Sequence, residues 1–258
     1  MFLYNWANGV FPDGTEAQDS RPWRGVTSEH IDAIRHWVEA HQLLCPIDVL
    51  LVGATGAGKS STLNALFGET RAQVGNGVAP ETQQVSAHQL HKLLRFHDSA
   101  GLGDEPAADR RHAENITARL QQRATVQGKE YLLIDLVLVL LDGGSRDLGT
   151  TYQLLEKVIL QGIEPERVVI AINQADMAMK GRYWNEETAR PEPELFAFLN
   201  EKAESVQRRI KDTTGLTVSR PVCYSALHGY NMNRLVEQII RHLPLQRRQG
   251  WRWGYYGR

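Results

Sequence analysis

A short glycine-rich segment combines residue types that bind phosphate. Gly53 is followed after four residues by Gly58-Lys59-Ser60, which fits the pattern G-x-x-x-x-G-K-[ST]. Small residues let backbone N–H groups approach phosphate oxygens, and the helix that follows adds a positive dipole. Lys59 supplies a mobile cation for the β- and γ-phosphates, and the Ser60 hydroxyl can bind Mg²⁺. The predicted nucleotide-binding residues of this loop are Gly53, Thr55, Gly56, Ala57, Gly58, Lys59, Ser60 and Ser61. A glycine-rich turn without a ligand is the weaker alternative.

Two further segments supply groups for a metal ion and a γ-phosphate. Asp98 ends an apolar run and Gly101 follows three residues later, in the order D-x-x-G. An aspartate at a strand end can hold Mg²⁺, and a glycine there lets its backbone N–H meet the γ-phosphate. Thr82, in the loop before, is the candidate threonine for Mg²⁺ and γ-phosphate. We therefore predict Ser60, Thr82 and Asp98 as metal ligands, and Lys59, Thr82 and Gly101 as catalytic residues.

Two later segments contain residues that can select a base. Asn173-Gln174-Ala175-Asp176 follows an apolar run and is close to the pattern N-K-x-D. A carboxylate such as Asp176 can accept hydrogen bonds from guanine N1–H and the exocyclic amine, a pair of donors that adenine does not offer. Ser225-Ala226-Leu227 resembles an S-A-[KL] element, whose backbone approaches guanine O6. Together these segments favour a guanine nucleotide.

The elements that must position these residues alternate along the chain. Apolar runs predict strands at 48–52, within 85–98, and at 134–142, 167–173 and 220–226. Helices are expected at 28–44, 59–68, within the mixed stretch 106–130, and at 149–162, 193–212 and 232–243. Strands separated by helix-length segments indicate a mainly parallel sheet covered on both faces, so the chain is α/β. Ligands of such sheets bind at the carboxyl ends of the strands.

The motifs "GATGAGKSSTLNALFG", "DSAGLGD" and "NQAD" resemble those of GTPases of the Era/TrmE/septin-like class. Within that class they resemble the small bacterial GTPases of the YeeP/YfjP type. The resemblance covers about residues 46–244. It implies a Ras-like P-loop NTPase fold with a mostly parallel six-stranded sheet, one antiparallel edge pair and helices on both faces. It also implies a Mg²⁺-dependent switch that hydrolyses GTP to GDP and phosphate.

Three positions depart from the pattern of this class. Gln174 replaces the usual lysine, Leu102 stands where Ras-like enzymes orient water with a glutamine, and Gly56 stands where some relatives keep a potassium-binding asparagine. We expect slow intrinsic hydrolysis, helped by an activating protein or by self-association. The alternative is a GTP-dependent scaffold, or a module docking on a membrane or partner, with little turnover of its own.

Composition is ordinary for a globular protein, with 42% hydrophobic and 23% charged residues. The net charge of −1 gives no general attraction for nucleic acid, which is the least favoured partner. Cys45 and Cys223 are expected to be buried free thiols, and the histidines, His97 and His112 among them, to be solvated or at edges rather than metal ligands. We find no signal peptide or membrane span, so we expect a cytoplasmic protein.

The expected organisation is an N-terminal extension (1–45) with an amphipathic helix, a GTPase domain (46–244) and a basic, aromatic tail (245–258). Arginine and aromatic residues in the tail suit packing on its own domain, peripheral contact with a membrane or partner, or, least, RNA. Residues 177–224 are longer than a simple crossover needs. They are either a partner surface or a plain insertion.

Overall fold

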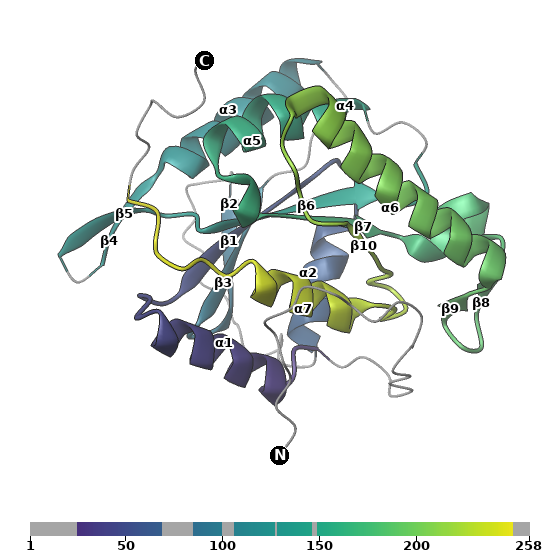
Figure 1. Ribbon diagram of the computed structural model, residues 1–258, viewed down its shortest axis with the longest axis horizontal. Helices are drawn as coiled ribbons and strands as arrows, with labels where there is room; N and C mark the ends of the chain where they lie inside the picture. Colours follow the sequence, from purple (N-terminus) through teal and green to yellow (C-terminus); the bar gives the residue numbers. More distant parts are fainter. Residues whose placement is uncertain (1–24, 69–84, 100–105, 127, 146–148, 250–258) are drawn as a thin grey trace.

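The computed structural model describes residues 25–68, 85–99, 106–126, 128–145 and 149–249. At its centre is a six-stranded sheet with the order β10-β7-β6-β1-β3-β2 (Figure 1). All neighbouring strands are parallel except the edge pair β2–β3, which is antiparallel. This confirms the predicted α/β fold with one antiparallel edge pair. The strands are β1 (Ile47–Gly53), β2 (Val85–His91), β3 (Leu94–Ser99), β6 (Leu136–Asp142), β7 (Val168–Asn173) and β10 (Val222–Cys223).

Helices cover both faces of the sheet, and β1 shows how the sequence produces this arrangement. Val49 and Leu51 pack into one hydrophobic cluster, whereas Leu50 and Val52 pack into the other. Because side chains alternate along a strand, a run that is apolar throughout contributes to both faces. In Figure 1 the helices form two layers, one below and one above the strands. The lower layer holds α1 (Ser28–Ala40), α2 (Lys59–Phe67) and α7 (Met232–Arg241), and the upper holds α3 (Pro106–Gln121), α4 (Gly149–Leu154), α5 (Leu160–Gly162) and α6 (Pro193–Thr214).

Local residue types fix the ends of several helices. The backbone N–H of His30 donates to the Thr27 hydroxyl, which caps α1. α6 has a proline at its first position and ends at Gly215, whose φ of 71° is left-handed. The predicted helix at 149–162 is present, but a π-helical turn, η2 (Leu155–Ile159), joins α4 to α5.

Some expected elements differ from the structure. The stretch 106–130 is helical only to Gln121, and a hairpin of β4 (Arg123–Val126) and β5 (Lys129–Leu132) follows. The strand predicted at 220–226 pairs only at Val222–Cys223, because a turn closed by a bridge between Ser225 and Tyr230 begins there. The helix expected at 28–44 ends at Ala40. A short hairpin of β8 (Trp184–Asn185) and β9 (Arg190–Pro191) and the 3₁₀ segments η3 (Pro165–Arg167) and η4 (Ala175–Gly181) complete the fold.

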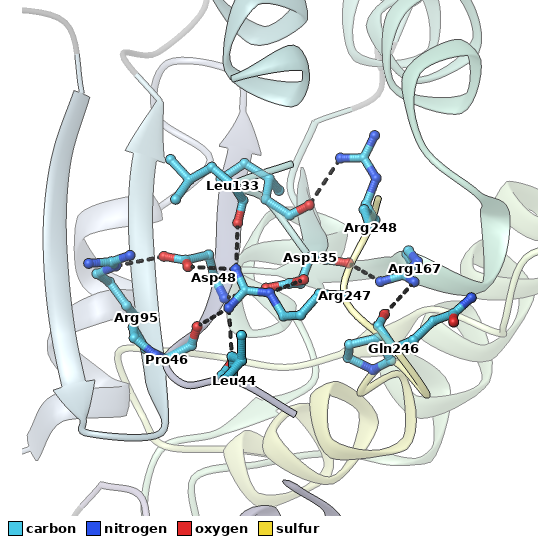
Figure 2. Close-up of polar contacts among 12 residues, drawn as sticks. Leu44, Pro46, Asp48, Arg95, Leu133, Asp135, Arg167, Gln246, Arg247 and Arg248 are labelled. Atoms are coloured by element: carbon cyan, nitrogen blue, oxygen red, sulfur yellow. Dashed lines mark hydrogen bonds and ion pairs between the residues drawn. The ribbon is translucent and has the colours of Figure 1, made fainter. Parts of the chain in front are cut away.

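A group of charged side chains lies buried at the amino ends of β1 and β6. We call Asp48, Asp135, Arg247 and Arg248 the arginine anchor (Figure 2). Arg247 pairs with Asp48 at 3.3 Å and with Asp135 at 2.9 Å, and all three are at most 4% exposed. Arg247 also donates to the carbonyls of Leu44, Pro46 and Leu133, and Arg248 donates to those of Leu120, Ile134 and Gly162.

The arginine anchor shows that the first part of the predicted tail packs against the sheet domain. Arg247 and Arg248 are 4% and 5% exposed, so they pack on their own chain. Residues 250–258 lie outside the described part of the chain.

The expectation of solvated or edge histidines is wrong for three of the histidines that the structure describes. His30, His97 and His112 are only 8%, 3% and 5% exposed. His97 is buried because its Nε2 meets the Asp48 carboxylate at 2.6 Å, a partner that lies 49 residues earlier in the chain. Both cysteines are free thiols and partly buried. In the described part of the chain, no helix combines the length and apolarity that a membrane span requires.

Candidate functional site

The candidate site begins in the loop between β1 and α2. Gly56 and Gly58 adopt φ angles of 81° and 83°, which side-chain-bearing residues rarely take. A Cβ atom on Gly58 would lie 2.2 Å from the Asn173 amide nitrogen, so the position also needs glycine for space. Gly58 thus lets the end of β7 approach the loop. Thr55, Ser60 and Ser61 are exposed along the loop and the start of α2.

Lys59 lies folded over the start of this loop. Its ammonium donates to the carbonyls of Gly53 at 2.8 Å and Ala54 at 3.2 Å, and the residue is 9% exposed. Burial lowers the pKa of Lys59, and the negative charge of Asp98 opposes that shift. Asp98 lies on β3 beside Leu51 of β1. A cation and a carboxylate therefore lie near enough to influence each other, at the carboxyl ends of two neighbouring parallel strands.

The segment after β7 is bonded to the phosphate loop by two side chains. The Asn173 amide donates to the Ala57 carbonyl at 3.0 Å and accepts from the Ala226 N–H at 3.1 Å. The Gln174 amide donates to the Gly56 carbonyl at 2.7 Å. The sequence did not predict these contacts. Asn173 and Gln174 thus hold together the phosphate loop and the segments that begin at Asn173 and Ser225.

Asp176 is buried with incomplete hydrogen bonding. It is 6% exposed, and its Oδ1 has no hydrogen-bond partner among the residues that the structure describes. A buried carboxylate oxygen without a donor costs free energy, so the position suits a ligand that brings N–H groups. Ser225 nearby is buried, whereas Leu227 is 80% exposed.

A further bond, also unpredicted, fixes α2 against the segment that follows β10. The buried hydroxyl of Tyr224 lies 2.7 Å from that of Thr62, which donates to the Gly58 carbonyl at 2.8 Å. Tyr224 therefore supports the phosphate loop from behind. The only signal in the sequence is a tyrosine directly before Ser225, and that does not identify its partner.

The structure brings most of the predicted site residues to one end of the sheet. Phosphate-loop residues, Asp98 and the two base-selecting segments all lie at the carboxyl ends of β1, β3, β7 and β10. Thr82, Gly101 and Leu102 lie outside the described residues.

Comparison with known proteins agrees with this arrangement. Residues 48–174 match the family model described as 50S ribosome-binding GTPase. GTPase Der of Mesorhizobium japonicum is 25% identical over 199 residues, which are 76% of this chain and 36% of that protein. The tRNA modification GTPase MnmE of Alkaliphilus oremlandii is 33% identical over 138 residues, which are 52% of this chain and 26% of that protein. The chain spans only about a third of the length of such curated relatives.

Solved structures show the same fold. Toc33 from Arabidopsis thaliana, in complex with Mg²⁺ and GMPPNP, superposes with a TM-score of 0.55 at 14% identity and covers 86% of this chain and 95% of its own. LeoA, a bacterial dynamin GTPase from ETEC, gives 0.50 at 15% identity, over 85% of this chain and 40% of its own. Residues 48–174, which hold the phosphate loop and Asp98, thus match a GTPase family model, and the chain is similar in sequence to the bacterial GTPases Der and MnmE and shares the fold of the solved GTPases.

Proposed function

We propose that this protein binds GTP together with Mg²⁺, hydrolyses it to GDP and phosphate, and acts as a molecular switch. The observation that carries the guanine assignment is Asp176, a buried carboxylate with an unpartnered oxygen. Its segment is bonded to the phosphate loop through Asn173 and Gln174. A base that donates two N–H groups would satisfy this carboxylate next to a phosphate site.

In this proposal each base-selecting residue makes a different contact. Asp176 accepts from guanine N1–H and the exocyclic amine. The Ala226 N–H is donated to Asn173, so we assign the O6 contact to the backbone N–H of Leu227. Asn173 and Gln174 hold the base-selecting segments against the phosphate loop, and Ser225 stabilises the turn by accepting from the His228 N–H at 3.3 Å.

Phosphate binding would use groups that already face the loop. Lys59 would exchange the carbonyls of Gly53 and Ala54 for the β- and γ-phosphates, and backbone N–H groups of residues 56–61 would donate to the same phosphates. The donor set fits Mg²⁺, because Ser60 and Asp98 offer hard oxygen ligands at the carboxyl end of the sheet. When bound, the ion neutralises charge on the phosphates. We also propose that Thr82 binds the metal and the γ-phosphate, and that the backbone N–H of Gly101 donates to the γ-phosphate.

We propose that a partner supplies the group that orients water for GTP hydrolysis. Leu102 has no polar group with which to orient water. In the structurally similar chloroplast translocon components, dimerization is important for GTPase activity. We propose that self-association or an activating protein supplies the missing group. The alternative remains a GTP-dependent scaffold with little intrinsic turnover, docked on a partner or, through the segment 245–258, on a membrane surface.

We further propose residues 46–244 as the GTPase domain, 1–45 as its extension and 245–258 as a tail, in a cytoplasmic protein of the YeeP/YfjP type. Single-turnover hydrolysis at increasing protein concentration tests the choice between enzyme and scaffold. A rate that rises with concentration supports catalysis completed by self-association. Negligible hydrolysis at every concentration, with tight GTP binding, would favour the scaffold.

The guanine assignment is tested by nucleotide titration with Mg²⁺ present. We expect wild-type protein to prefer GTP to ATP, and Asp176→Asn to lose GTP affinity by about 100-fold. The asparagine amide can donate to the C2 carbonyl of xanthine, so this variant should gain affinity for XTP. Asp212→Asn, an exposed carboxylate on α6, is the matched control. Equal binding of ATP and GTP by the wild type would refute the assignment.

A further inference from the structure

A histidine lies beside the proposed base-selecting carboxylate. His228 Nε2 is 3.8 Å from Asp176 Oδ2, and Nδ1 of the same ring is 3.9 Å from Glu186 Oε2. Its side chain is 22% exposed, compared with 7% for Asp176 and 76% for Glu186. The imidazole therefore lies between a buried and an exposed carboxylate. With hydrogens on both nitrogens, it can donate toward both.

The segment 177–224 supplies the surroundings that hold this ring. Trp184 of β8 packs on His228 with ring centroids 5.1 Å apart, and on Tyr230 at 5.6 Å. Trp184 also belongs to a small hydrophobic cluster, separate from the two that cover the sheet, whose buried members are Ala175, Ala178, Trp184, Leu195 and Leu199. Through Trp184 the hairpin thus packs into a cluster that also contains Ala175 of the base-selecting segment.

Such a contact matters because a carboxylate rotates easily about its last side-chain bond. Guanine needs the carboxylate of Asp176 in one plane to accept two hydrogen bonds. His228 lies beside Oδ2, whereas Oδ1 has no hydrogen-bond partner among the described residues. The present 3.8 Å exceeds a direct hydrogen bond, but contacts of this kind in ligand-free sites commonly shorten in the complex.

We propose that His228 is a positioning residue, which orients the Asp176 carboxylate for guanine, and that the β8–β9 hairpin holds His228 in place through Trp184. The inference rests on the proposed function, since it presupposes that Asp176 selects the base. It also gives the insertion at 177–224 a role in nucleotide selectivity. Glu186, the exposed carboxylate, makes a smaller contribution to holding the His228 ring.

Two variants of His228 test this proposal. His228→Leu keeps an apolar side chain against Trp184 but removes the donor, whereas His228→Gln keeps an N–H donor near the position of Nε2. Affinities for GTP and for ITP, which lacks the exocyclic amine, are measured by calorimetry with Mg²⁺. We expect the leucine variant to lose about fivefold to tenfold in GTP affinity and less in ITP affinity, so that its GTP/ITP selectivity falls. The glutamine variant should keep most of the selectivity.

A merely structural role predicts a different pattern. If both variants lower the melting temperature but leave the GTP/ITP ratio unchanged, the positioning role is wrong. Equal selectivity losses in the leucine and glutamine variants would also overturn it, because the donor would not matter. Asp176→Asn separates the two proposals. If it abolishes GTP binding while His228→Leu leaves the ratio unchanged, only the inference about His228 fails.

Discussion

The polar side chains at the two ends of β1 differ in the charged partners that they have. At the amino end, Asp48 meets Arg95 and His97 at 2.6 Å each and Arg247 at 3.3 Å. At the carboxyl end, Lys59 donates only to backbone carbonyls, and one oxygen of Asp176 on the neighbouring segment has no partner among the described residues. The buried charges at the amino end are paired with opposite charges, whereas the carboxyl end keeps donors and acceptors available to a ligand.

This difference shows how buried charge serves structure in one place and binding in another. A fully paired buried network fixes one arrangement of the chain, and removing a partner leaves an uncompensated charge. A buried group without a partner suits a ligand that completes it. We therefore expect substitutions in the arginine anchor to affect stability, and substitutions at the carboxyl end to affect nucleotide binding.

The largest effect is expected from Arg247→Met. The change removes the cation shared by Asp48 and Asp135 and leaves both carboxylates buried. Unfolding free energy should fall by about 3–5 kcal/mol, measured by denaturant titration. GTP affinity of the folded fraction should stay within about twofold, since the anchor lies at the opposite end of β1. Arg123→Met, in an exposed pair with Glu130, is the control and should change stability by less than about 1 kcal/mol.

Lys59→Ala should produce the reverse pattern. GTP affinity is expected to fall by about 100-fold, because a charge-assisted contact with the phosphates is lost. The melting temperature should change little, since Lys59 forms hydrogen bonds with the carbonyls of Gly53 and Ala54 and takes no part in the arginine anchor. Isothermal titration and thermal melts provide the two measurements, with exposed Lys129→Ala as the control. Retention of GTP affinity within a few-fold would mean that Lys59 does not contact the phosphates.

Asp135 offers a test by pH. Burial raises its pKa from 3.8 to about 7, against the opposing charge of Arg247. A raised pKa in the folded state means that the associated stability is present at low pH and is lost as pH rises towards about 7. The stability of Asp135→Asn relative to wild type should therefore increase by about 2–3 kcal/mol between about pH 5 and about pH 8.

Asp48 and His97 are present in both proteins, so the comparison removes most of their own contribution, and the repulsion between Asp48 and Asp135 is part of the measured difference. Burial alone would raise the pKa of Asp48, but the hydrogen bonds from His97 and Arg95 lower it overall. Burial lowers the pKa of His97. A stability difference between Asp135→Asn and wild type that is independent of pH would show that Asp135 is ionised throughout.

The smallest effect is expected at Gln174. Gln174→Leu removes the donor to the Gly56 carbonyl, which should cost about 1 kcal/mol of GTP binding, or about fivefold in affinity. Gln174→Lys restores a donor of similar reach and adds a charge, so its affinity should equal or exceed that of the wild type. Stopped-flow measurement of GTP release gives the comparison. Identical release rates in all three proteins would show that the contact does not affect nucleotide binding.

The parts of the site that could be predicted from sequence are local. Gly58-Lys59-Ser60 is a contiguous pattern between an apolar run and a helix, and Asp98 and Asp176 each follow an apolar run. In a parallel sheet the carboxyl ends of strands meet at one edge, so separate motifs could be assigned to one site. The mainly parallel sheet followed from the same alternation of strands and helices, whereas its six strands and antiparallel edge pair were implied by the family resemblance.

The parts that could not be predicted depend on partners far along the chain. Nothing near Arg247 or His97 shows that both contact Asp48, because the register that pairs β1 with β3 is set by the whole sheet. The contact of Gln174 with Gly56 spans 118 residues. The β4–β5 hairpin is different, because its signal was local: Gly128, with a φ of 77°, follows a run containing Thr125 and Val126.

The arginine anchor also has a consequence for the order in which the protein can complete its fold during synthesis. Asp48 precedes Arg247 by 199 residues, so a chain emerging from the ribosome presents both buried carboxylates long before their shared cation exists. The phosphate loop, α2 and the base-selecting segments are all made before that cation. We therefore predict that a nascent chain stalled before Arg247 is more sensitive to protease than one stalled after the full sequence has emerged. Equal sensitivity would show that the domain completes its fold without Arg247.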